Sequence, residues 1–233
     1  MIFYGRNVVK EALTSKFKSH KLYIQNNINK DNKISEIIAL AKSRAIHVED
    51  INPKKLSKLT NSNEHQGIAI EIDYSVEKLS SINIPDFNDS FIYISDVTYE
   101  HNIGAIIRSA ECSGLKGVII PNNTNITGTV AKISTGALFH IPVYREAIFN
   151  SIKFFKDLGF KIVGIERDGE KYFESDLSGN NLLIIGGEDK SLSDRVRKKS
   201  DLIVEIPQFG KVNSLNMSVA ASIIMFDRVR QVS

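Results

Sequence analysis

The sequence predicts an α/β fold, with a mainly parallel sheet in the larger part of the chain and a small α/β module before it. Strand-like and helical segments alternate along almost all of the 233 residues, which is the pattern of a parallel sheet covered by helices on both faces. The length suffices for a small domain and a medium one. Residues 75–88, rich in Ser and Asn with little periodicity, are interpreted as a linker between the two.

Residues 1–74 are predicted to form the small module. "KISEIIALAKSR" has the periodicity of an amphipathic helix, and Pro53 opens a short helix. The predicted elements are helix 6–15, strand 20–25, helix 33–44, strand 46–50, helix 53–60 and strand 67–73.

Residues 89–233 are predicted to form the larger domain. The predicted strands are 91–96, 117–121, 141–145, 160–167, 181–188 and 201–207, and the predicted helices are 102–114, 128–138, 147–159, 191–200 and 214–230. In the last helix, Leu215, Val219, Ile223 and Phe226 have helical spacing, so we expect one core-facing side.

Composition limits the possible compartments and cofactors. Hydrophobic residues make up 42% and charged residues 24%, which is ordinary for a globular protein. No apolar run is long enough to span a membrane, and the N-terminus does not resemble a signal peptide. One cysteine and five scattered histidines give neither a disulfide framework nor a zinc-ligand spacing. We therefore expect a cytoplasmic protein with no membrane association and no metal.

The net charge of +3 is unevenly distributed. Residues 1–74 contain 12 Lys and Arg against 8 Asp and Glu, whereas residues 89–233 contain 17 of each. A basic module beside a neutral domain is typical of a part that holds a polyanion attached to a part that does chemistry. An ordinary solvated surface explains the same excess equally well.

Polar residues follow three predicted strands, at the edge where parallel sheets bind ligands. Asn102 is placed as a helix N-cap and Arg108 lies further along that helix; a simple cap and a surface arginine are the alternative. "GGE" (186–188) allows close approach to the backbone, or forms only a tight turn. Ser214 and Asn216 open the last helix, where free N–H groups are available, either as part of a pocket or as caps. No G-x-G-x-x-G or P-loop motif is present.

Three segments in order resemble the motifs of the SpoU/TrmH group of SPOUT RNA 2′-O-ribose methyltransferases. They are "DVTYEHNIGAIIRSAECSGLKGVIIP", "LLIIGGE" and "IPQFGKVNSLNMSVAASIIMFDRVRQ". "KISTGALFHIPV" is similar to the segment after the first motif. "YGRNVVKEAL" and "EHQGIAIEI" resemble the small, ribosomal protein-like RNA-binding domain of the bacterial 23S rRNA guanosine 2′-O-methyltransferases. The resemblance covers nearly the whole chain.

The resemblance implies a fold and a set of partners. It implies a deep trefoil α/β knot in the C-terminal domain, an exception to the rule that chains avoid knots. It also implies a homodimer, an rRNA substrate and S-adenosyl-L-methionine as the cofactor. On this basis Gly186, Ser214, Ile206 and Leu215 are expected to contact the cofactor.

The resemblance also assigns catalytic residues. It places Arg108 at the ribose 2′-hydroxyl, aided by Asn102, Glu188 and Asn216. A guanidinium is a poor base, since its pKa exceeds about 12. We therefore favour a role for Arg108 in holding the phosphate and stabilising developing alkoxide charge, and the sequence leaves the general base open.

One departure and two alternatives qualify this interpretation. After Glu188 the family usually has further glycines, whereas this chain has Asp189, Lys190 and Ser191, which makes the loop stiffer and more charged. One alternative is a tRNA guanosine 2′-O-methyltransferase of the same fold. The other is a non-catalytic RNA-binding ribosome-assembly protein, against which the joint presence of the four polar site residues argues.

Overall fold

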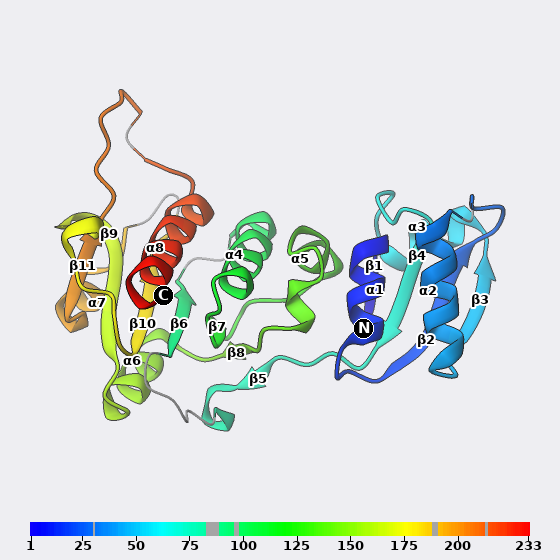
Figure 1. Ribbon diagram of the computed structural model, residues 1–233, viewed down its shortest axis with the longest axis horizontal. Helices are drawn as coiled ribbons and strands as arrows, with labels where there is room; N and C mark the ends of the chain where they lie inside the picture. The colour runs from blue at the N-terminus through cyan, green and yellow to red at the C-terminus, as the bar shows by residue number, and fades with distance from the viewer. Residues whose placement is uncertain (30, 83–88, 96–97, 188–190, 213) are drawn as a thin grey trace. The chain divides into compact units, whose positions relative to one another are not determined.

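The structure, a computed structural model, divides the chain into two units (Figure 1). It describes residues 1–233 except 30, 83–88, 96–97, 188–190 and 213. The first unit comprises Met1–Ser75 and Ile126–His140, and the second comprises Val76–Asn125 and Ile141–Ser233. The sequence predicts one domain over residues 89–233, which includes residues 126–140, whereas the contacts of these residues group them with the N-terminal module.

A four-stranded sheet forms the centre of the first unit. Its order is β1-β4-β2-β3, in which β2 and β3 are parallel and the other pairs antiparallel. The elements are β1 (Ile2–Tyr4), α1 (Arg6–Thr14), β2 (Ser19–Gln25), α2 (Asn32–Ser43), β3 (His47–Ile51), α3 (Pro53–Thr60) and β4 (Ile68–Ile72). Each element predicted for residues 1–74 is present, and the three-residue strand β1 is an addition.

Local signals account for the helices of this unit. The Asp31 side chain accepts a hydrogen bond from the N–H of Ile34 and so caps α2, while Asn52 caps α3 through the N–H of Lys54. Pro53 occupies the first turn of α3, where a missing N–H costs nothing. Asn61 ends that helix in the left-handed conformation.

The inserted segment 126–140 completes the core of the first unit. It forms α5 (Gly128–Ile133) and the 3₁₀ turn η2 (Ala137–Phe139). The ring of Phe139 meets Phe3 edge to face at 5.2 Å and Tyr74 at 6.1 Å between centroids. Phe3 is fully buried and Phe139 is 4% exposed, so the aromatic cluster depends on both stretches of chain.

The second unit is built on a seven-stranded sheet in which every neighbouring pair is parallel. Its order is β11-β9-β10-β6-β7-β8-β5. The strands are β5 (Glu77–Lys78), β6 (Ser90–Ile94), β7 (Gly117–Ile120), β8 (Val143–Arg145), β9 (Lys161–Lys171), β10 (Asn181–Ile185) and β11 (Leu202–Glu205). The predicted parallel sheet is confirmed. The segment expected to be a linker contributes β5 and the 3₁₀ turn η1 (Leu79–Ser81), and Leu79 is 2% exposed.

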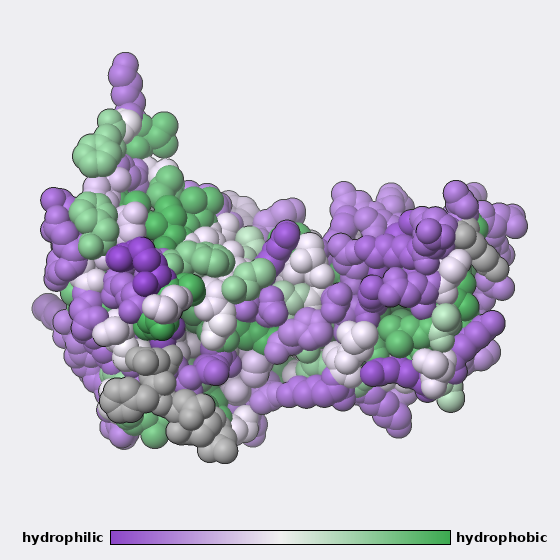
Figure 2. All heavy atoms as spheres, viewed as in Figure 1, coloured by the Kyte–Doolittle hydropathy of each residue, from purple (hydrophilic) through white to green (hydrophobic). Residues whose placement is uncertain are grey.

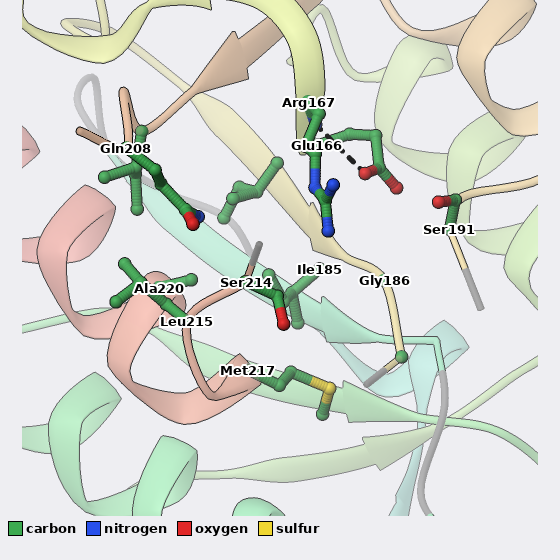
Figure 3. Close-up of a pocket in the computed structure, with 13 residues that line it drawn as sticks. Glu166, Arg167, Ile185, Gly186, Ser191, Gln208, Ser214, Leu215, Met217 and Ala220 are labelled. Atoms are coloured by element: carbon green, nitrogen blue, oxygen red, sulfur yellow. Dashed lines mark hydrogen bonds between the residues drawn. The ribbon is translucent and has the colours of Figure 1, made fainter. Parts of the chain in front are cut away.

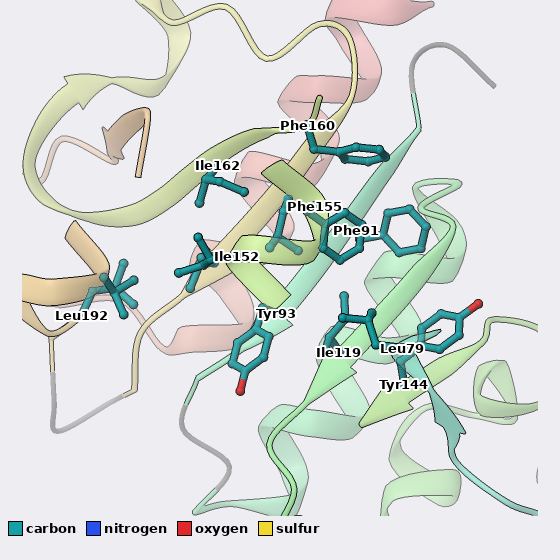
Figure 4. Packing of buried hydrophobic residues seen from close by; sticks show 13 residues of the cluster. Leu79, Phe91, Tyr93, Ile119, Tyr144, Ile152, Phe155, Phe160, Ile162 and Leu192 are labelled. Carbon is teal, nitrogen blue, oxygen red and sulfur yellow. The ribbon is translucent and has the colours of Figure 1, made fainter. Parts of the chain in front are cut away.

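Helices cover both faces of this sheet. They are α4 (Glu100–Cys112), α6 (Ile148–Asp157), α7 (Asp194–Lys199) and α8 (Met217–Val232), with the 3₁₀ turn η3 (Tyr172–Glu174) after β9. On one face, Phe155 of α6 packs on Phe91 of β6 and on Phe160, with ring centroids 4.9 and 5.0 Å apart (Figure 4). Alternate residues such as Ile92 point to the other face. None of the helices among the described residues has the length and apolar character needed to cross a membrane.

Two sequence predictions about helices are wrong. Helix α4 begins at Glu100 with Tyr99 at the N-cap, so Asn102 lies inside its first turn. Helix α8 begins at Met217, and the face marked by Val219 and Phe226 is not core, because these side chains are 47% and 48% exposed. The core-facing residues of α8 are Met217, Ala221, Ile224 and Met225. Periodicity identified an apolar stripe, but a second apolar stripe on the same helix is the one that packs on the sheet.

Candidate functional site

A cavity of about 240 Å³ lies where β10 and β11 of the second unit end, beside the middle of β9 (Figure 3). Its wall comes from the middle of β9, from the residues that follow β10 and β11, and from the chain that leads into α8. The lining residues are Ile165, Glu166, Arg167, Ile185, Gly186, Gly187, Ser191, Ile206, Gln208, Ser214, Leu215, Met217 and Ala220. Carboxyl ends of parallel strands are where open α/β sheets bind their ligands, so the cavity is the candidate site.

All four residues predicted to contact a cofactor line this one cavity. Gly186 follows β10, Ile206 follows β11, and Ser214 and Leu215 precede α8. The structure therefore brings together segments that are up to 29 positions apart in the sequence. Gly186 is buried and has no side chain, which leaves its peptide groups accessible to a ligand.

The cavity has an apolar side and a polar side. Ile185, Ile206, Leu215 and Met217 supply aliphatic and thioether surface. Glu166, Arg167, Gln208 and Ser214 supply hydrogen-bonding groups. Apolar walls with a few placed polar groups are typical of sites for small organic ligands.

Asn102 and Asn216 are joined by a hydrogen bond beside the cavity. The Nδ2 group of Asn216 donates to Oδ1 of Asn102 over 3.0 Å. Asn216 is also the N-cap of α8, because its Oδ1 accepts from the Ser218 N–H at 2.9 Å. Asn102 is 7% exposed. The pair ties the first turn of α4 to the start of α8, next to the lining residues Leu215 and Met217.

Arg108 lies on the exposed side of α4 and does not line the cavity. It is six residues beyond Asn102, which is about 9 Å along a helix. The next residue, Ser109, receives a hydrogen bond from Ser222 of α8 at 2.8 Å between the hydroxyl oxygens. Among the described residues, no acidic side chain forms an ion pair with Arg108. Its guanidinium is thus on a surface that a large ligand can reach.

Glu188, with Asp189 and Lys190, lies outside the described residues. Gly187 and Ser191 on either side of this stretch both line the cavity. The predicted role of Glu188 stays a prediction.

Sequence reasoning missed Glu166 and Arg167. Both Glu166 carboxylate oxygens accept backbone hydrogen bonds, one from Arg167 at 3.0 Å and one from Leu192 at 2.7 Å. A signal was present, because two charged residues end the apolar strand "FKIVGI". Polar residues after three other predicted strands mark candidate site residues, and Glu166 and Arg167 follow the same pattern.

The first unit has an exposed basic helix. Lys54, Lys55 and Lys58 of α3 are exposed. Three other lysines of the unit, Lys10, Lys21 and Lys132, form ion pairs with acids, as Lys10 does with Glu36 at 2.6 Å. Within the described ranges, no carboxylate forms an ion pair with the three lysines of α3.

As for metals, the part of the chain that the structure describes contains no cluster of three His, Cys, Asp or Glu side chains that could hold an ion.

Comparisons with known proteins match both parts of the chain. The SpoU rRNA Methylase family matches residues 89–226, and the family of RNA 2′-O ribose methyltransferase substrate-binding domains matches residues 2–75. A Staphylococcus saprophyticus protein assigned to the TrmH family of tRNA/rRNA methyltransferases is 38% identical over 99% of this chain and 96% of its own length.

Solved structures share the fold over the whole chain. An AdoMet-bound rRNA methyltransferase from Sinorhizobium meliloti has a TM-score of 0.84 at 23% identity and covers 100% of this chain and 87% of its own. The SpoU methyltransferase AviRb from Streptomyces viridochromogenes, in complex with the cofactor AdoMet, also has a TM-score of 0.84, at 22% identity, and covers 100% and 90%. The SPOUT fold class predicted from the sequence is confirmed by these neighbours.

The family matches, which cover both the parallel-sheet domain and the small module before it, identify the chain as an RNA methyltransferase. The chain belongs to the SpoU rRNA Methylase family.

Proposed function

We propose that the protein transfers a methyl group from S-adenosylmethionine to the 2′-hydroxyl of a ribose, that of a guanosine, in large-subunit rRNA. The observation that carries this proposal is the convergence of Gly186, Ile206, Ser214 and Leu215 on one cavity, with the Asn102–Asn216 hydrogen bond beside it. An rRNA substrate makes the cytoplasm the compartment of the enzyme.

The cavity fits the proposed cofactor chemically. Aliphatic side chains on one side suit an adenine ring, and peptide groups next to Gly186 suit its hydrogen-bonding edge. Polar side chains on the other side suit the ribose and the amino-acid part. Bound there, S-adenosylmethionine supplies an electrophilic methyl group without a metal. The relatives with AdoMet in their structures support this assignment.

The residues of the chain position and polarise the RNA. Arg108 holds the phosphate next to the target ribose and stabilises the charge that develops on the 2′-oxygen. Asn102 and Asn216 fix the start of α8 relative to α4 and so fix the cavity relative to Arg108. Glu188 is proposed to assist at the same step. Holding the hydroxyl in line with the methyl group supplies much of the rate.

The N-terminal module supports rRNA over tRNA. Its match to a substrate-binding family and its exposed lysines suit a part that grips RNA through phosphates. A tRNA enzyme of this fold more often relies on extensions of the catalytic domain. The S. saprophyticus relative is described for both RNAs, so a tRNA guanosine methyltransferase is the second candidate.

The second unit forms a homodimer through α8 in this proposal. Val219, Ile223 and Phe226 form an apolar stripe on the helix, and Val219 and Phe226 are about half exposed. Figure 2 shows apolar side chains gathered over this part of the unit. A second copy related by a two-fold axis would cover the stripe with the same stripe.

Two experiments test the proposed function. Mapping of 2′-O-methylation in rRNA from cells with and without the protein should reveal one missing guanosine methylation. An unchanged rRNA map with a lost tRNA methylation would favour the second candidate. Separately, Gly186→Val should abolish S-adenosylmethionine binding in calorimetry, because the added side chain enters the cavity. Full binding by a folded Gly186→Val variant would place the cofactor elsewhere.

A further inference from the structure

Arg167 projects its guanidinium into the candidate cavity (Figure 3). The side chain extends from the middle of β9 toward Ser214 and Ile185 on the other wall. Among the described lining residues, Arg167 alone has a cationic side chain. Within the part of the chain that the structure describes, no carboxylate forms an ion pair with it.

A bulge in β9 places Arg167 in the cavity wall. Ile203 of β11 pairs with Gly164 of β9, and the next residue of β11, Val204, pairs with Glu170. Residues 165–169 of β9 therefore loop out of this ladder. Bulges beside functional sites typically redirect a side chain that a regular strand would point elsewhere.

Several contacts fix the backbone of this bulge. Arg197 of α7 donates from Nη1 to the carbonyl of Arg167 at 3.1 Å, and the Asp168 N–H donates to Glu205 at 3.0 Å. Asp168 has a φ of 57°, in the left-handed region. A side chain at Gly169 would collide with the carbonyl oxygen of Ile203, 2.5 Å from the ideal Cβ position. Backbone strain held in place by neighbours in this way is concentrated at functional sites.

The carboxylate of the adjacent residue, Glu166, is hydrogen-bonded to the backbone. Its two carboxylate oxygens accept the N–H groups of Arg167 and Leu192. Figure 3 shows the carboxylate directed toward the Ser191 side, away from the guanidinium. The cavity thus offers an exposed planar guanidinium on a held backbone, and the neighbouring Glu166 carboxylate forms no ion pair with it.

We propose that Arg167 binds the carboxylate of the amino-acid part of S-adenosylmethionine. This inference rests on the proposed function. A guanidinium and a carboxylate match in geometry through two parallel hydrogen bonds. The contact orients the amino-acid end at the β9 side of the cavity, which leaves the apolar side formed by Ile206 and Leu215 for the adenine. Arg167 is then a specificity-determining residue that distinguishes the cofactor from nucleosides lacking this carboxylate.

Calorimetry with matched ligands tests the pairing. The full-length protein is titrated with S-adenosylmethionine, with decarboxylated S-adenosylmethionine, and with 5′-methylthioadenosine. Decarboxylation removes only the carboxylate and keeps the sulfonium and the amine. Arg167→Ala should weaken binding of S-adenosylmethionine by about 10-fold to 100-fold, as for other hydrogen bonds to charged groups. Binding of the two ligands without a carboxylate should change by less than about 2-fold.

Two further variants sharpen the test. Arg167→Lys keeps the charge but loses the fork, so it should recover only part of the lost affinity. Arg195→Ala removes an arginine of α7 that lies over the Phe149 ring and does not line the cavity, and it should bind all three ligands normally. Near-ultraviolet circular dichroism checks that each variant is folded.

The outcomes separate this inference from the proposed function. An equal loss of affinity for all three ligands in Arg167→Ala would overturn the inference, because it would show that the side chain shapes the cavity or pairs within the protein. Unchanged affinity for S-adenosylmethionine would overturn it as well. If the unmodified chain binds neither S-adenosylmethionine nor its decarboxylated form, the proposed function fails, and the inference fails with it.

Discussion

At the scale of single residues, Asn102 and Arg108 illustrate how one helix serves two purposes. Asn102 is buried and hydrogen-bonded to Asn216, whereas Arg108 is exposed on the same helix. Among the described residues of the second unit, no acidic side chain forms an ion pair with Arg108. We therefore expect Arg108 to act by binding a ligand, which in the proposed function is the phosphate of the RNA.

Arg108 should act through geometry rather than through charge alone. Arg108→Lys keeps the charge but loses the planar fork. If the fork holds phosphate and ribose oxygen together, lysine should fail nearly as badly as alanine, since a misplaced group at a reacting centre costs about 100-fold. The single-turnover methylation rate at saturating RNA measures this, with cofactor affinity unchanged. A near-normal rate for Arg108→Lys would show that the residue is a surface arginine without a catalytic role.

His65 should make the stability of the first unit depend on pH. It is 6% exposed, its Nδ1 accepts the Gly67 N–H at 3.0 Å, and its Nε2 lies 3.0 Å from the Ser57 hydroxyl. Burial lowers its pKa below the ordinary value of 6.5. Between the lowered pKa and 6.5, His65 is therefore mostly protonated in the unfolded chain and mostly neutral in the folded chain. The contribution to stability is complete above pH 6.5 and is lost as the pH falls below it.

Urea denaturation at pH 7.5 and 5.5 measures this effect. The unmodified protein should lose stability at the lower pH, by at most about 1.4 kcal/mol per pH unit from this one group. His65→Gln should remove that part of the pH dependence, while His47→Gln at an exposed position should leave it in place. The same pH dependence in both variants would contradict the assignment.

At the scale of elements, the start of α8 combines a cap with a tertiary link. Asn216→Ala removes both the N-cap, worth about 1 kcal/mol, and the donor to the buried Asn102. Asn216→Ser keeps a capping oxygen but is too short for the link, so it should be less destabilising than alanine. A double-mutant cycle with Asn102→Ala should give a coupling of about 1 kcal/mol in the free energy of unfolding. Strict additivity would show that the hydrogen bond contributes nothing.

The sequence predicted the positions of helices and strands better than it predicted which of their faces pack in the core. Helix α3 was predicted at its observed bounds, because Pro53 marks its start; in the structure Asn52 and Asn61 cap its two ends. Strand β1 was missed because three residues carry no periodicity. The solvent-facing stripe of α8 was assigned to the core, since an apolar stripe reveals amphipathicity but not its partner. The two charged residues after "FKIVGI" mark Arg167 as a candidate, but the direction of its side chain depends on a bulge that arises from pairing between distant strands.

At the scale of the whole molecule, the first unit includes residues 126–140, which interrupt the chain of the second unit, and this affects the design of deletions. Residues 126–140 lie within the SpoU rRNA Methylase match but pack with the N-terminal module, where Phe139 is 4% exposed. Deleting residues 1–74 would therefore expose apolar side chains such as Phe139, whose ring packs on Phe3. Changing surface charge is the cleaner way to test the proposed RNA-binding role of the module.

Neutralising the α3 lysines should weaken RNA binding without affecting the cofactor. The triple variant Lys54→Ala, Lys55→Ala and Lys58→Ala removes three exposed cations. Affinity for rRNA fragments should fall, and the dependence of log affinity on log salt should become shallower by about 0.7 for each lost contact to single-stranded RNA. Alanine at the exposed Lys153, Lys198 and Lys199 of the second unit is the matched control. An equal effect of both triple variants would mean that α3 has no special role.

The proposed dimer should depend on the solvent-facing stripe of α8. Val219 and Phe226 are 47% and 48% exposed, and Ile223 lies between them on the same side of the helix. Burial of apolar area stabilises association by about 25 cal/mol per Å², and a two-fold axis makes each substitution count twice. Phe226→Glu, which places two carboxylates in the interface, should therefore convert the dimer to a monomer in sedimentation velocity. Phe173→Glu introduces the same charge at a phenylalanine of η3 that is 51% exposed and should leave the dimer intact. A Phe226→Glu variant that sediments as a dimer would show that α8 is not the interface, and a monomeric unmodified protein would remove the homodimer from the proposed function.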